Sequence, residues 1–207
     1  MSDLHKALGD IASIREDLAR STQFRGYGPA TLAATGIFAM LAAAAQSRYL
    51  PYPAQHPLAY LRIWGALAIL SAGLTAAQMI TRTRRVHSGI SNQMLRQAVE
   101  QFLPALAAGV LLTLVLLRHY SAATFWMLPG LWQLVFSLGV FASCRFLPRP
   151  MLAAGVWYLC CALACLGFGN SRALSPWTMG LAFGGGQLLI AAILFFTAQE
   201  AEDDAEI

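Results

Sequence analysis

Two long apolar segments joined by a short polar link constrain this chain more than any other feature. Residues 102–143 read FLPALAAGVLLTLVLL, then RHYSAATFW, then MLPGLWQLVFSLGVFAS. Each apolar segment approaches the length of about 20 residues that a helix needs to cross a bilayer. Such a segment must satisfy its backbone groups internally, and neither segment alternates like a strand of a membrane barrel. The centre of the chain is therefore predicted to be a helical hairpin that crosses a membrane twice.

Similar units precede and follow this hairpin. Hydrophobic residues make up 57% of the chain and charged residues 12%, and the latter is about half the charged share of a soluble domain. We therefore predict an all-α, polytopic membrane protein with six transmembrane helices arranged as three hairpins. The expected spans, which together form a transmembrane domain over residues 29–198, are 29–46, 58–80, 103–118, 123–143, 151–169 and 177–197. Residues 1–28 are predicted to form a cytoplasmic amphipathic helix with a glycine-rich joint, and residues 199–207 an acidic cytoplasmic tail.

The orientation follows from the distribution of basic residues among the connections. With the N-terminus inside, ten of the 14 basic residues lie on the cytoplasmic side, as the positive-inside rule requires. The outer four are Arg48, Arg62, Arg118 and Arg172. Tryptophans near the outer starts of three spans, Trp64, Trp126 and Trp177, are expected at the membrane interface. Both termini are therefore predicted to be cytoplasmic.

The acidic residues exclude several kinds of transport and catalysis. None of the ten lies within an expected span, whereas proton- and sodium-coupled transporters usually place a carboxylate at membrane depth. No metalloprotease, serine-hydrolase or phosphate-binding motif occurs. Gly184, Gly185 and Gly186 lie within the last span and, with Gly180, are interpreted as a helix-packing face. We expect no catalytic residue, no cofactor, no metal and no direct binding of nucleic acid.

The cysteines and histidines are the residues that could bind a metal or haem, which is the minor alternative to a chain without cofactors. Cys161 and Cys165 share a face of the fifth span, but no Cys-x-x-Cys pair occurs, and buried cysteine serving as a small apolar residue is the favoured interpretation. His56 and His119 belong to outer connections, where a haem or metal held between them is the alternative to ordinary solvated side chains.

Neutral polar residues inside the expected spans form the candidate interior site. One interpretation is interhelical hydrogen bonding, and the other is a lined cavity for a neutral or amphipathic ligand. The residues of this candidate polar cavity are Gln78, Gln133, Ser137, Tyr158 and Gln187.

The N-terminal segment carries an apolar stripe at helical spacing, which makes it a candidate partner-binding element. The residues of the stripe are Leu4, Leu8, Ile11, Ile14 and Leu18. Four acidic and three basic residues between positions 2 and 22 leave a net charge of −1, so attraction to an anionic lipid surface is weak. We expect the segment to dock on protein instead, against the face near Leu95, Ala98 and Phe102. The basic run Arg82, Arg84 and Arg85 would attract its acids.

The opening of the chain also resembles a known group of proteins. Residues 14–24, IREDLARSTQF, followed by a glycine-rich joint and an alanine-rich span, are similar to the start of uncharacterised bacterial multi-span inner-membrane proteins with a cytoplasmic N-terminal helix. Genes of that group often lie beside one for a winged-helix transcriptional regulator. The resemblance covers about the first forty residues and implies a multi-pass protein of the cell inner membrane.

Taken together, the sequence predicts a non-enzymatic integral membrane protein with a sensing, regulatory or scaffolding role exerted through its cytoplasmic elements. Its expected partners are the lipid bilayer and either a cytoplasmic protein or further copies of itself. The alternative is a transporter or channel for a small neutral or hydrophobic solute.

Overall fold

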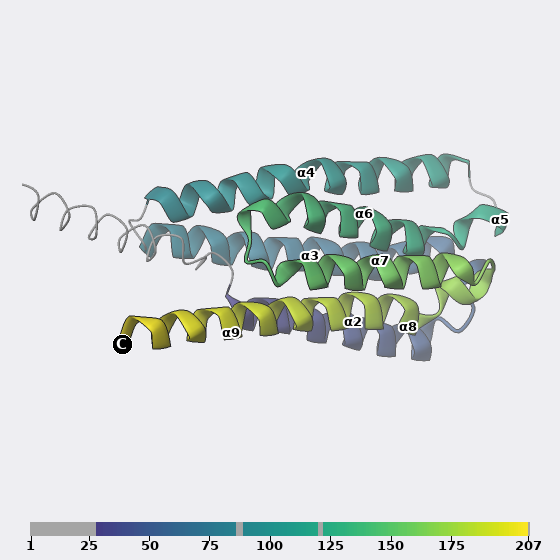
Figure 1. Cartoon of the computed structure of the whole chain (residues 1–207). Helices are drawn as coiled ribbons and strands as arrows, with labels where there is room; N and C mark the ends of the chain where they lie inside the picture. Colours follow the sequence, from purple (N-terminus) through teal and green to yellow (C-terminus); the bar gives the residue numbers. More distant parts are fainter. Residues whose placement is uncertain (1–27, 86–88, 120–121, 207) are drawn as a thin grey trace, which may run out of the picture.

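The computed structural model describes residues 28–85, 89–119 and 122–206, and this part of the chain is all-α. Six helices form its body and run side by side along one long axis (Figure 1). Their bounds are α2 (Pro29–Tyr49), α3 (Pro57–Arg85), α4 (Gly89–Arg118), α6 (Leu128–Ser143), α7 (Met151–Gly167) and α9 (Gly186–Glu206). The connecting elements are η1 (Pro53–Gln55), α5 (Ala122–Phe125), η2 (Cys144–Phe146), η3 (Ser171–Leu174), α8 (Pro176–Met179) and η4 (Gly180–Gly185).

Four of these helices are long and apolar enough to cross a membrane. They comprise Pro29–Tyr49, Pro57–Thr81, Val99–Arg118 and Pro176–Gln199, the last of which combines α8, η4 and most of α9. The apolar helices α6 and α7 are shorter, with 16 and 17 residues. The length and composition of these four helices indicate a helical, multi-pass membrane protein.

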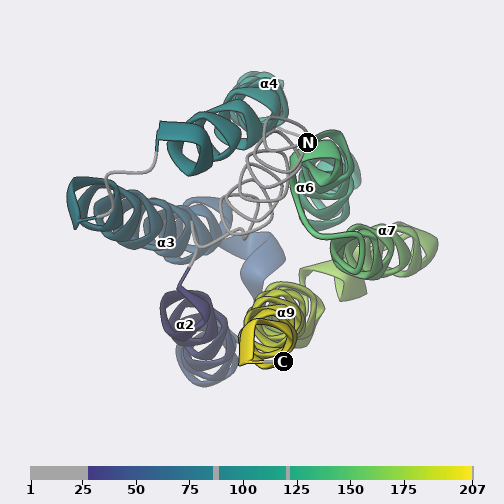
Figure 2. The ribbon, with the colours of Figure 1, turned by 60° about the vertical axis from the view of Figure 1, so that its left-hand side comes forward.

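The six helices pack in the order α3, α2, α9, α7, α6, α4, which forms an arc (Figure 2). The two members of each expected hairpin are neighbours, since α2 contacts α3, α4 contacts α6 and α7 contacts α9. Within the described residues, α3 and α4 share no substantial packing surface although they follow each other in the chain. These two helices form the ends of the arc.

The fourth expected span is interrupted in the structure. Residues 123–143 are divided between α5, which ends at Phe125, and α6, which begins at Leu128. Pro129, which would kink a continuous helix, instead lies in the first turn of α6. Proline is well suited to a first turn, because the amide hydrogen that it lacks would have no partner within the helix.

Two buried clusters fill the bundle. One lies toward the end that carries α5 and includes Tyr60, Trp64, Phe125, Leu128 and Leu174. The other, toward the opposite end, is built from the apolar residues Leu32, Val140, Met151, Ala154, Tyr158, Ala191 and Leu194.

Glycines allow α2 to approach the last span closely between these clusters. A Cβ atom at Gly180 would lie 2.5 Å from the Cβ of Ala43, and one at Gly184 would lie 2.9 Å from Met40. The expected packing role of Gly180 and Gly184 is therefore confirmed.

Candidate functional site

Polar side chains from three neighbouring helices, α2, α6 and α7, bond to main-chain carbonyls of the segment 171–186, where the chain enters the last span. This segment contains two short helical turns and a stretch of π-helix. Irregular backbone at membrane depth requires partners from the protein for its polar groups, because lipid offers none. Side chains from the neighbouring helices supply them.

Gln46 of α2 is the first of these partners and is fully buried. Its Nε2 atom donates a hydrogen bond to the carbonyl of Leu174 at 2.9 Å. Its Oε1 atom accepts a hydrogen bond from the indole Nε1 of Trp64 at 2.7 Å. One amide thus joins α2, α3 and η3. Trp64 is 2% exposed, so it belongs to the interior and not to the membrane interface that its position in the sequence suggested.

Gln133 of α6 supports the next turn. Its Nε2 atom donates to the carbonyl of Thr178 at 2.9 Å and lies 3.8 Å from the Sδ of Met179. The hydroxyl of Thr178 in turn donates to the carbonyl of Ala173 at 2.7 Å. The thiol of Cys165 lies 3.7 Å from the same carbonyl. Cys165 is buried, in agreement with its expected role as a small apolar residue that makes at most a weak hydrogen bond.

The π-helical segment η4 follows directly. A π-helix is rare and is frequently found at functional sites. Trp157 of α7 donates its indole hydrogen to the carbonyl of Ala182, within η4, at 3.0 Å. Gly185 lies under the Trp157 ring, and Gly186 lies so close to the ring of Tyr158 that a Cβ would overlap it. The glycines therefore make room for two aromatic side chains that pack against the interrupted helix.

Tyr158 is fully buried between the rings of Phe136 and Phe183, at centroid distances of 4.6 and 5.4 Å. Its hydroxyl interacts with the nearby side chain of Gln187. Neither the hydroxyl nor the Gln187 Oε1 atom makes a hydrogen bond of acceptable geometry.

Two further buried polar atoms in the described part of the chain lack a partner, namely Gln133 Oε1 and the Tyr60 hydroxyl. Each such group costs about 1–3 kcal/mol when it is left unpaired away from water.

The structure brings four of the five residues of the candidate polar cavity to the interface of α6, α7 and the last span. Ser137 donates to the carbonyl of Gly155 at 3.0 Å, one turn from Tyr158, and Gln133 and Gln187 lie on the neighbouring helices as described. Gln78 lies elsewhere. Its side chain contacts Gly28 at the start of α2 and occupies the space that a Cβ would take there.

Sequence reasoning did not select Gln46, Trp157 or Thr178 as site residues. Gln46 carried a usable signal, because a glutamine that ends an alanine-rich span is costly unless it is paired. Trp157 and Thr178 carried no signal in the sequence, because their partners are backbone carbonyls that become available only through the local geometry of residues 173–182.

The candidate partner-binding residues fall mostly outside the described part of the chain. Residues 4–18 lie outside it entirely. The helix α3 extends through Arg85, so the basic run continues the helix, although the side chains of Arg82, Arg84 and Arg85 are not among those described. Glu100, the only acid beside an expected span outside the tail, pairs with Arg96 on the surface at 2.7 Å.

No group of three or more potential metal ligands occurs among the described side chains. The fold identifies the class of the protein, which is a helical bundle with four candidate membrane-spanning helices. No protein-family model, curated protein or solved structure matches the chain.

Proposed function

We propose that the chain is a six-span protein of the bacterial inner membrane with both termini in the cytoplasm. Helices α6 and α7 lie within the same bundle as the four long helices. At 1.5 Å per residue they measure about 24 and 26 Å, which is close to the hydrocarbon thickness that a spanning helix must cover. The short element α5 extends the fourth span at one end, and η2 follows the span at the other.

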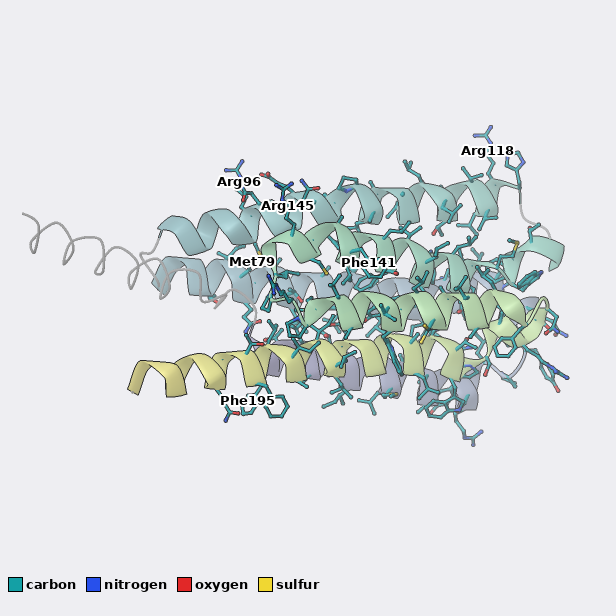
Figure 3. All side chains as sticks on the ribbon, viewed as in Figure 1. Met79, Arg96, Arg118, Phe141, Arg145 and Phe195 are labelled. Carbon is teal, nitrogen blue, oxygen red and sulfur yellow. The ribbon has the colours of Figure 1, made fainter. Side chains whose placement is uncertain are left out.

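The distribution of charged and aromatic side chains supports this orientation. Arg96 and Arg145 lie at one end of the bundle and Arg118 at the other (Figure 3). The Arg118 end also carries the exposed aromatic residues Tyr49 and Tyr52, which follow α2. Aromatic side chains favour the interface, and arginine favours the cytoplasmic side.

Within this topology we propose a non-enzymatic role in sensing, regulation or scaffolding, exerted through the cytoplasmic elements. One observation carries this proposal: the interior polar side chains are engaged in holding the bundle together. Gln133, Ser137 and Trp157 each donate to a main-chain carbonyl of another helix. Such hydrogen bonds stabilise the packing of membrane helices against each other. The cytoplasmic segments are then the part of the chain that acts on other molecules.

A cellular experiment tests this role directly. A chain that lacks residues 2–22 should insert normally and should reproduce the changes in transcript levels that follow from loss of the whole protein. A matched variant that lacks only residues 201–207 serves as a control for altered length. If removal of residues 2–22 leaves the transcript profile like that of the intact chain, the N-terminal element does not mediate the function.

An unpaired oxygen near η4 favours transport of a small neutral solute as the second candidate function. Gln133 Oε1 is a buried acceptor without a donor among the described residues, and a hydrogen-bonding solute would satisfy it. Proteoliposomes that contain the protein should be compared with empty liposomes for glycerol and urea entry by stopped-flow light scattering. The regulatory proposal predicts equal rates. Faster entry that is abolished by Gln133→Leu would instead support transport.

A further inference from the structure

The segments that form the α5 end of the bundle carry basic residues and no acidic ones. These segments are residues 47–62, 118–127 and 168–177. Their basic residues are Arg48, Arg62, Arg118 and Arg172, all of which are exposed. The other ten basic residues of the chain are matched by its ten acids, so the formal net charge of +4 equals the charge of these segments. Unbalanced cations beside a membrane attract anions.

Three of these arginines surround the hydrogen bonds of Gln46. Each lies two residues from a member of the hydrogen-bonded set formed by Gln46, Trp64 and Leu174. Successive residues of an α-helix are about 100° apart, so a residue two positions from a buried one lies on nearly the opposite side. The hydrogen-bonded set thus faces inward and the arginines outward. We call Arg48, Arg62 and Arg172 the arginine patch.

The connections around α2 and α3 bring Arg172 to the other two arginines. The element η1, between α2 and α3, packs against η3, which contains Arg172. The side chain of Asn170 accepts a hydrogen bond from the backbone amide of Arg172 at 2.9 Å and fixes the start of η3. Among the described residues, no member of the arginine patch has an ion-pair partner. The patch therefore presents unpaired positive charges from three segments that are joined to one another.

The arginine patch lies near the ends of membrane-spanning helices. Arg48 is next to the last residue of the candidate span Pro29–Tyr49, and Arg62 lies about 8 Å along the span that begins at Pro57. An arginine so close to a helix end extends its guanidinium group to the interface. The exposed rings of Tyr49 and Tyr52 follow Arg48 and favour the same zone. The anion that this zone supplies is the phosphate of a lipid headgroup.

We propose that the arginine patch binds the phosphate headgroup of an anionic phospholipid, with phosphatidylglycerol as the representative ligand. A guanidinium group presents several N–H donors in one plane, which suits the oxygens of a phosphate. A headgroup bound there joins α2, α3 and η3 from outside, as Gln46 joins them from inside. The inference depends on the membrane-spanning character of the bundle. It depends neither on the orientation of the bundle nor on its regulatory role.

Native mass spectrometry of the purified full-length protein tests the site. The protein is released from detergent micelles that contain equal amounts of phosphatidylglycerol and phosphatidylcholine, and the ratio of the two bound lipids is measured. The wild-type chain should retain phosphatidylglycerol preferentially. Arg172→Gln should lower the ratio by about fivefold, which is the effect of one basic residue near an anionic lipid surface. Replacing all three arginines of the patch by glutamine should abolish the preference.

Arg118→Gln is the matched control. Arg118 is exposed at the same end of the bundle (Figure 3), but it belongs to α4, which packs on α6 and not on the segments of the patch. Its replacement removes the same charge and should change the ratio less than twofold. An equal loss in Arg118→Gln and Arg172→Gln would overturn the site in favour of diffuse attraction by net charge.

Two further outcomes would overturn the assignment to lipid. Displacement of phosphatidylglycerol by excess inorganic phosphate would assign the patch to a soluble phosphate compound. Equal retention of the two lipids by the wild-type chain would assign the patch to an acidic segment of a partner protein. Because the measurement involves neither transcription nor solute flux, its failure leaves the proposed function standing, and failure of the proposed function leaves the lipid site standing.

Discussion

Gln46 illustrates how one residue can hold three segments in place. Both polar atoms of its amide are used, one toward the Leu174 carbonyl and one toward the Trp64 indole. All three residues are at most 2% exposed. Because these groups are shielded from water, loss of the amide would leave both the Leu174 carbonyl and the Trp64 indole hydrogen without a hydrogen-bond partner.

We expect Gln46→Met, which preserves most of the side-chain volume, to lower the free energy of unfolding by about 2 kcal/mol, within the range for buried groups that lose their partners. The measurement is unfolding in mixed micelles with increasing sodium dodecyl sulfate, followed by circular dichroism. Ser47→Ala is the matched control, because the neighbouring Ser47 is exposed and bonds only to Ala44 of its own helix. Equal stability of the two variants would contradict the structural role of Gln46.

Cys144, at the end of α6, provides a prediction on pH. Burial disfavours the thiolate and raises the pKa of this thiol above its ordinary value. In a variant whose other cysteines are replaced by serine, the rate of alkylation by iodoacetamide should reach half of its maximum at a higher pH in the folded protein than in denaturant. The denatured variant supplies the reference, because unfolding restores the ordinary pKa. Coincident pH profiles would show that the thiol is not shielded.

At the scale of elements, the last span differs most from a simple helix. Its π-helical turn is stabilised by Trp157, which donates to Ala182, and its glycines fit against α2 and α7. Glycine in a helix is costly unless a close approach needs it. The chain contains both situations, since Gly180 faces Ala43 of α2, whereas no described atom lies within 4 Å of a Cβ at Gly65.

Gly180→Ala should destabilise the bundle by about 1–3 kcal/mol, because neither the new Cβ nor that of Ala43 can move without separating the helices. Gly65→Ala should leave stability unchanged or raise it by up to about 1 kcal/mol through helix propensity. Both values come from unfolding in mixed micelles. The interpretation of the glycine face would be wrong if the two substitutions had the same effect.

Much of this level of structure follows from sequence, and the exceptions have physical causes. Apolar length and the prolines at positions 29, 57 and 176 indicate where α2, α3 and the last span begin, because these features act locally. The interruption at residues 126–127, the π-helix and the buried position of Trp64 depend on neighbours distant in sequence. The Trp64 indole is drawn inward by Gln46, 18 residues away. Gln133 could be recognised as an interior residue, but its acceptor, Thr178, is 45 residues distant.

At the scale of the whole molecule, the two ends of the bundle differ in chemistry. The end where α2 and α3 are joined carries the exposed rings of Tyr49 and Tyr52, and Trp177 begins the last span at 48% exposure. The opposite end carries Arg96 and Arg145 (Figure 3). An insertion that places the end with Arg96 and Arg145 in the cytoplasm puts these aromatic rings at the outer interface, where Arg48, Arg62, Arg118 and Arg172 also lie.

This asymmetry predicts which cysteines an impermeant thiol reagent reaches in intact cells. In a background without native cysteines, Ser47→Cys and Ser171→Cys should react, because both positions are exposed at the ends of α2 and η3. Ser88→Cys, in the connection between α3 and α4, should react only after the inner membrane is permeabilised, and this treatment also serves as the control for its reactivity. The six-span arrangement requires positions 47 and 171 to share a side, since an even number of crossings separates them. Labelling of one without the other would therefore exclude six spans. Labelling of position 88 alone would show that the protein is inserted in the opposite orientation.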